Sequence, residues 1–185
     1  MYGRRLVRMH LRAKKVAFLG LSMALSVVLV ILSSVIESNT LFLLALASFF
    51  TGIALGEFGI SAGAGYLAGS TFLSFLLAPN KLYVLTYLGI SLYLVLMEVI
   101  WVKGCKCMDT AATHRIMQAS KFIIFNCMYI PLLLFAPKIV TTKAITPVFF
   151  VALLVVGQVV IILYDYAYHY FMNRYWLKLR RLINN

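Results

Sequence analysis

The sequence is dominated by apolar runs that are long enough to cross a lipid bilayer. The first of them, 16–36, contains no charged residue, and a spanning α-helix needs about 20 such residues. Over the whole chain 63% of residues are hydrophobic and 12% are charged, whereas soluble domains carry about 25% charged residues. A soluble fold made from this chain has too few polar groups to cover its surface. We therefore predict an all-α integral membrane protein.

Short polar or glycine-rich breaks divide the apolar sequence into six candidate spans. They are 16–36, 41–56, 60–78, 82–102, 122–136 and 146–168. The second and third can also be read as one long stretch with a break inside the membrane. The turn Gly56-Glu57-Phe58-Gly59 favours two helices, because irregular backbone is not tolerated in contact with lipid. The expected fold is a single domain over 1–185, a bundle of about six transmembrane helices.

Lys and Arg are concentrated in three segments, which fixes the expected orientation. These segments are a basic N-terminal arm (1–15), the loop 103–121 and the C-terminal tail (171–185), whereas the opposite loops hold only Lys81, Lys138 and Lys143. Within the loop, residues 109–121 are expected to form a short amphipathic helix on the cytoplasmic face. The positive-inside rule places both termini in the cytoplasm, and an even number of spans agrees with this. The formal net charge of +12 therefore indicates contact with anionic lipid headgroups. No nucleic-acid-binding module is visible.

Few ionisable residues fall within the apolar runs. Glu98 lies near the inner end of the fourth, and Asp165 and His169 lie four residues apart near the inner end of the sixth, so they share a helix face. They are candidates for a coupling role at a partner interface or for salt bridges with nearby Lys and Arg. A proton relay needs a chain of such groups through the membrane, which is missing. An intramembrane lipid-modifying enzyme would have only these three groups, so we expect no enzyme.

No motif indicates a cofactor or a metal. Cys105-Lys106-Cys107 lacks a second pair of ligands, and His114 alone does not complete a zinc site. Free or palmitoylated cysteines beside the membrane are the preferred interpretation. Nucleotide-binding loops and nucleophile–base constellations are not found in the sequence.

Polar and aromatic residues near the predicted outer helix ends, and a few deeper ones, are candidates for a substrate pocket. They are Asn39, Tyr83, Thr86, Tyr87, Asn126, Tyr129 and Gln158. Small-molecule sites combine an apolar, aromatic lining with a few convergent polar groups. Ordinary helix-end polarity explains the same residues.

Small residues recur at four-residue spacing over the inner half of the first predicted helix. Ala13 and Ala17 form one such pair, and Gly20 and Ala24 form another. Faces of this kind let two helices approach closely in lipid. They indicate either packing within the bundle or docking of a partner.

The chain length, the span count, the inward termini and the basic arm leading into Ala13-x-x-x-Ala17 together resemble one known family. This is the S-component, the substrate-binding membrane subunit of energy-coupling-factor transporters, which import vitamins and other micronutrients into bacteria and archaea. The resemblance implies a pocket that opens outward and a plasma-membrane location. It also implies a transmembrane coupling subunit and ATPase subunits as partners, with Ala13 and Ala17, extended by Gly20 and Ala24, facing the coupling subunit. Vitamin-specific signatures are not found, so the substrate stays open.

A scaffold is the alternative. The rod-shape membrane protein MreD is similar in size, span count and glycine-rich middle, and it transports nothing. The carrier and scaffold hypotheses differ in where they place the side chains of the outer polar residues. Convergence of Asn39, Tyr83, Tyr87, Asn126 and Gln158 on one cavity favours a carrier, whereas contact with lipid headgroups favours a scaffold.

Overall fold

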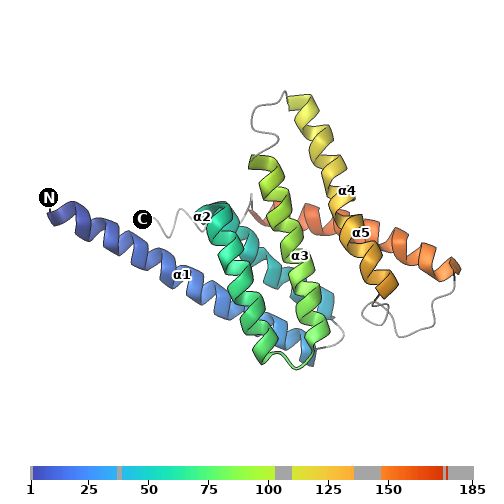
Figure 1. Ribbon diagram of the computed structural model, residues 1–185, viewed down its shortest axis with the longest axis horizontal. Coiled ribbons are helices and arrows are strands. Elements are labelled where there is room, and N and C mark those ends of the chain that lie inside the picture. Colours follow the sequence, from blue (N-terminus) through green and yellow to red (C-terminus); the bar gives the residue numbers. More distant parts are fainter. Residues whose placement is uncertain (1, 37–38, 103–109, 136–146, 173, 175–185) are drawn as a thin grey trace. The chain divides into compact units, whose positions relative to one another are not determined.

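The computed structural model describes residues 2–36, 39–102, 110–135, 147–172 and 174, and this part of the chain is helical. Its helices are α1 (Tyr2–Val35), α2 (Thr40–Leu77), α3 (Lys81–Ile100), α4 (Thr110–Phe135) and α5 (Pro147–Phe171) (Figure 1). Four helical segments are long and apolar enough to cross a membrane: Lys15–Val35, Thr40–Leu77, Lys81–Ile100 and Phe150–Phe171. The all-helical fold class is confirmed, and these segments indicate a membrane protein.

The chain divides into two compact units. The first, Met1–Val95, contains α1, α2 and most of α3, and the second, Leu96–Asn185, contains the end of α3 with α4 and α5. Several predicted features lie outside the described residues. These are Glu37, the Cys105-Lys106-Cys107 segment, Lys138, Lys143 and the basic tail beyond 174.

Helix α2 reverses direction at one residue. Gly59 has φ 82° and ψ 176°, a region that only glycine enters without strain. A Cβ built on Gly63 would lie 3.1 Å from Leu55 Cα, although eight residues of straight helix separate two atoms by about 12 Å. The chain therefore folds back into two arms, 40–58 and 60–77, of roughly 27 Å each. The predicted break over 56–59 is confined to Gly59, and Gly56 and Glu57 are helical.

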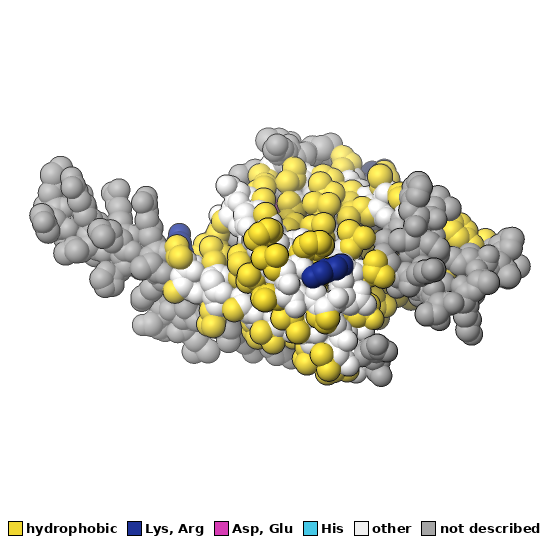
Figure 2. Space-filling view, turned by 60° about the horizontal axis from the view of Figure 1, so that its bottom comes forward, with side chains coloured by type: hydrophobic (Ala, Val, Ile, Leu, Met, Phe, Trp, Pro, Cys, Tyr) yellow, Lys and Arg dark blue, Asp and Glu magenta, His cyan; other side chains and the backbone are white. Residues whose placement is uncertain are grey.

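The first unit packs α1 against both arms of α2. Ser26 on α1 contacts Ala47 on the first arm and Tyr66 on the second, and α3 adds Val84 and Tyr87 to the interior. On the outside of the same unit, the side chains of Leu21 and Phe72 are 74% and 66% exposed. Figure 2 shows hydrophobic side chains over much of the described surface in that view. An apolar exterior of this extent is expected where lipid, not water, covers the helices.

Helix α4 differs from the prediction. The sequence favours a separate amphipathic helix over 109–121 ahead of a span over 122–136, but the structure has one continuous helix, Thr110–Phe135. Because neither glycine nor proline occurs between Thr110 and Pro131, nothing in this sequence interrupts the helix. The four segments that are long and apolar enough to cross a membrane belong to α1, α2, α3 and α5. Among the described helices, α4 does not meet that criterion.

Candidate functional site

The small-residue face of α1 is exposed in the first unit. Ala17, Gly20 and Ala24 are all exposed, and a Cβ built on Gly20 would meet no heavy atom within 4 Å. Ala13 lies on the same helix, but its side chain is outside those that the structure describes. Within the described first unit these three residues therefore do not serve packing against α2. They form a smooth strip, here called the α1 face, that another helix can approach closely.

The basic end of α1 is held close to the Gly59 reversal. Lys15 Nζ lies 5.9 Å from the centroid of the Phe58 ring, and the Phe18 and Phe58 ring centroids are 6.1 Å apart. These contacts combine a cation–π interaction with a tilted aromatic pair. They place the start of the α1 face and the turn of α2 at the same end of the first unit.

Hydroxyl groups, not charges, supply the polar interior of the first unit. Eight serine and threonine side chains of the described part are buried: Ser22, Ser26, Ser33, Ser48, Thr51, Ser70, Ser74 and Ser91. Several bond to carbonyls of their own helix, as Ser33 does to Val30 at 2.7 Å. Others join different helices, which matters in lipid because the hydrophobic effect does not drive helix association there.

Tyr66 and Tyr87 organise the contacts between helices. Ser26 donates to the Ala47 carbonyl at 3.0 Å, and a hydroxyl has only one proton, so Tyr66 donates to Ser26 across 2.8 Å. By the same reasoning Ser70 donates to the Leu67 carbonyl and receives the Tyr87 proton at 2.8 Å. Tyr87 Oη also lies 3.3 Å from Thr51 Oγ1, and Thr51 in turn donates to Ser91 at 3.4 Å. Tyr87 thus bonds α3 to the second arm of α2, and the bond from Thr51 to Ser91 joins α3 to the first arm.

Tyr87→Phe is expected to lower the stability of the first unit by about 1 kcal/mol, because Ser70 loses the hydroxyl that donates to it while the ring still fills its site. Thermal unfolding of the purified protein in detergent measures the change. Tyr83→Phe on the same helix is the matched control, since Tyr83 is only half-buried. Equal midpoints for the two variants would contradict the assigned role of the Tyr87 hydroxyl.

Three of the predicted pocket residues meet between α4 and α5. Gln158 Nε2 donates to Asn126 Oδ1 at 2.7 Å, Asn126 Nδ2 donates to the Phe122 carbonyl at 2.8 Å, and Tyr129 donates to the Leu153 carbonyl at 3.0 Å. Gln158 Oε1 is buried and has no hydrogen-bond partner among the residues that the structure describes. These side chains, here called the amide cluster, join two helices and retain one unused acceptor.

The other predicted pocket residues do not belong to the amide cluster, so the described contacts do not show the convergence on one cavity that would favour a carrier. Tyr87 is fully buried in the hydroxyl interior of the first unit, Asn39 is exposed at the start of α2 with no side-chain cap bond, and Thr86 donates to the Leu82 carbonyl at 3.1 Å. The sequence did not predict the polar network that joins Ser26, Thr51, Tyr66 and Ser70. The available signal was the occurrence of hydroxyl residues within apolar runs.

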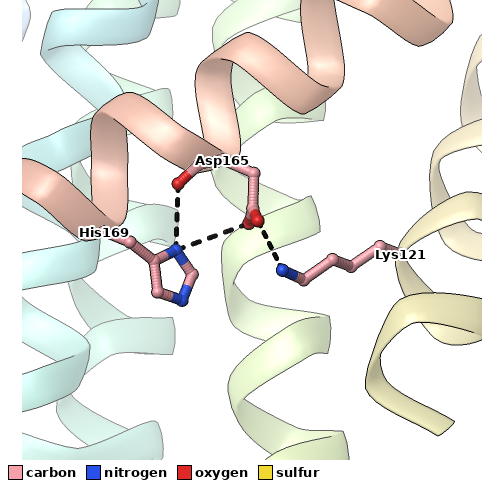
Figure 3. A network of polar contacts seen from close by, with 3 residues as sticks. All are labelled: Lys121, Asp165 and His169. Carbon is pink, nitrogen blue, oxygen red and sulfur yellow. Dashed lines mark hydrogen bonds and ion pairs between the residues drawn. The ribbon is translucent and has the colours of Figure 1, made fainter. Parts of the chain in front are cut away.

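Asp165 on α5 is the centre of a small charged group (Figure 3). It forms an ion pair with Lys121 of α4, and its Oδ1 lies 3.6 Å from His169 Nδ1. The same His169 nitrogen lies 2.9 Å from the Asp165 carbonyl oxygen. Because that oxygen only accepts, Nδ1 carries the proton and donates it. Glu98, the third residue predicted for a coupling or salt-bridge role, is half-buried near the end of α3.

A hollow of about 380 Å³ lies beside this group and is lined by Tyr166, His169, Tyr170 and Arg174. The described chain thus offers an exposed face on α1, a hydroxyl interior, the amide cluster and an aromatic–basic hollow at the end of α5. No family model, curated protein or solved structure matches the chain.

Proposed function

We propose that this chain is the membrane-embedded substrate-binding subunit of a micronutrient importer of the energy-coupling-factor type. The observation that carries the proposal is the exposed α1 face of Ala17, Gly20 and Ala24. Small residues at this spacing stabilise a membrane protein when a second helix packs closely against them. No helix of the described first unit packs against this face. In this proposal the helix that packs on the α1 face comes from a transmembrane coupling subunit, as the resemblance to S-components implies.

The proposed topology has six passes with both termini in the cytoplasm of a prokaryotic cell. In this proposal the two arms of α2 each cross the membrane, because each is roughly 27 Å long and the hydrocarbon core is about 30 Å thick. The span predicted over 122–136 supplies another pass in this proposal, although α4 is not among the four segments that are long and apolar enough to cross a membrane. The α1 face then begins in the cytoplasmic half of the membrane, directly after the basic arm, and the Gly59 turn lies on the same side. A coupling subunit linked to cytoplasmic ATPases reaches this position.

The amide cluster is the proposed substrate contact. Gln158 Oε1 is a buried acceptor with no partner in the described part of the chain, and an unsatisfied buried acceptor carries a free-energy penalty of about 1–3 kcal/mol. A donor group on a small polar metabolite that enters from the outer side would remove this penalty. Because the sequence contains no nucleotide-binding loop, the energy for release comes from separate ATPase subunits in this proposal.

Native mass spectrometry of the protein purified from its own membrane tests the proposal. We expect a bound metabolite together with a coupling subunit and ATPase subunits. Gly20→Leu is expected to reduce co-purification of these subunits by roughly tenfold or more, because a bulky side chain separates the two helices. The control is Gly65→Leu, since Gly65 is equally exposed, with nothing within 4 Å of a Cβ, on the second arm of α2.

An unchanged partner set in the Gly20 variant would rule out docking on the α1 face. Co-purification of cell-wall or division proteins in place of ATPases, with no bound metabolite, would replace the carrier by the scaffold. Equal thermal midpoints of the two leucine variants in detergent establish that lost binding is not lost folding.

A further inference from the structure

The hollow at the end of α5 combines an arginine with aromatic side chains. Tyr166 and Tyr170 are 71% and 50% exposed, and their rings stack at 6.5 Å between centroids. His169 lies on the same stretch of helix, and Arg174 follows it beyond the last turn of α5. Tyrosine is enriched at membrane–water interfaces because its ring is apolar and its hydroxyl is polar.

The charges around the hollow favour an anion. Asp165 is the nearest acid along the helix, and its charge is offset by Lys121. Its contacts also orient His169, and Figure 3 shows the Nε2 edge of the ring turned away from Asp165. Among the ion pairs of the described residues, none engages Arg174. Arg174 is exposed, and the planar array of donors on its guanidinium matches phosphate oxygens.

The position of the hollow distinguishes a lipid from a free ion. It lies where the apolar segment Phe150–Phe171 ends. One turn earlier, Ile162 and Leu163 are 56% and 66% exposed, so acyl chains have an apolar surface directly beside it. The sequence continues into Lys178, Arg180 and Arg181, and basic segments next to a span attract anionic headgroups.

We propose that the hollow of Tyr166, His169, Tyr170 and Arg174 is a binding site for the phosphate of an acidic phospholipid headgroup. Arg174 holds the phosphate oxygens, the tyrosines lie at the interface beside it, and the acyl chains follow the exposed side of α5. This site is separate from the amide cluster and from the α1 face, so it does not depend on the proposed transport function.

Native mass spectrometry of the full-length protein, delipidated in detergent, tests the site by titration with phosphatidylglycerol. Phosphatidylcholine with the same acyl chains and inorganic phosphate are the other two probes. We expect phosphatidylglycerol to bind, and we expect Arg174→Gln to weaken its binding by roughly tenfold. Arg115→Gln is the matched control, since Arg115 is an exposed arginine on α4 that does not line the hollow, and we expect binding within about twofold of wild type.

An equal loss in the Arg115 variant would mean general surface attraction and would overturn the proposal. Arg174-dependent binding of phosphatidylcholine or of inorganic phosphate, at the same strength as phosphatidylglycerol, would overturn it as well. If Arg174→Gln does not fold, Arg174→Lys keeps the charge and removes the planar fork. A several-fold loss in the lysine variant supports the site, and wild-type binding by that variant contradicts it.

Discussion

Gly59→Val is expected to prevent the first unit from folding. The residue has φ 82° and ψ 176°, and a β-branched side chain in this region costs about 3 kcal/mol or more. The reversal at Gly59 also brings Leu55 next to Gly63, and it lets Thr51 and Ser70 reach Tyr87. Relief of the strain by straightening the backbone would separate both pairs. We therefore expect loss of monodisperse protein, measured by size-exclusion chromatography after detergent extraction.

The matched control for this variant is Gly65→Ala. Gly65 is a helical glycine six residues further along the same helix, and a Cβ there meets nothing within 4 Å. Alanine is favoured over glycine within a helix by up to about 1 kcal/mol, so this variant should be as stable as wild type or slightly more stable. Normal yield and elution of the Gly59 variant would show that the chain reverses without a glycine.

Gly157→Leu is expected to separate α4 from α5. A Cβ at this position would lie 2.7 Å from Tyr129 Cζ and 3.0 Å from its hydroxyl oxygen, so a larger side chain displaces the ring. Displacement breaks the bond from Tyr129 to the Leu153 carbonyl, and a shift of α5 also breaks the bond between Gln158 and Asn126. Overpacking of this kind costs about 1–3 kcal/mol, and each lost bond between helices adds about 0.6 kcal/mol.

A double mutant separates the steric effect from other causes. Tyr129→Ala removes the ring, so Gly157→Leu in that background should cost much less than it does in the wild-type protein. Thermal unfolding in detergent measures all four members of the cycle. If the leucine lowers the midpoint equally in both backgrounds, the contact between Gly157 and Tyr129 is not what limits the approach of the helices.

The helices were largely predictable because their signal is local. Apolar runs bounded by glycine, proline or polar residues gave the spans of α1, α3 and α5, and the glycine turn gave the reversal near Gly59. The continuity of α4 was not predicted, because the amphipathic pattern over 109–121 differs from that of the following apolar run. A change in composition alters where a helix lies, but without a glycine or proline it does not end the helix.

The polar groups were harder to predict because their partners are distant in the sequence. Asn126 and Gln158 were singled out as pocket candidates, and the structure joins them across 32 residues. Tyr87 was grouped with them as an outer residue, but its ring is fully buried against Ser70 and Thr51. Depth along a span can be read from residue number, whereas the direction of a side chain depends on which helix packs beside it.

The hydroxyl interior of the first unit has an electrical consequence. A full charge that crosses the membrane potential changes energy by about 2.3 kcal/mol per 100 mV, whereas Ser, Thr and Tyr side chains are neutral at physiological pH. The hydroxyl contacts between α1, α2 and α3 therefore exchange no net charge when they break and re-form. A rearrangement confined to this interior would produce no gating current, and its equilibrium would be the same in an energised cell and in a detergent micelle of matched hydrophobic thickness.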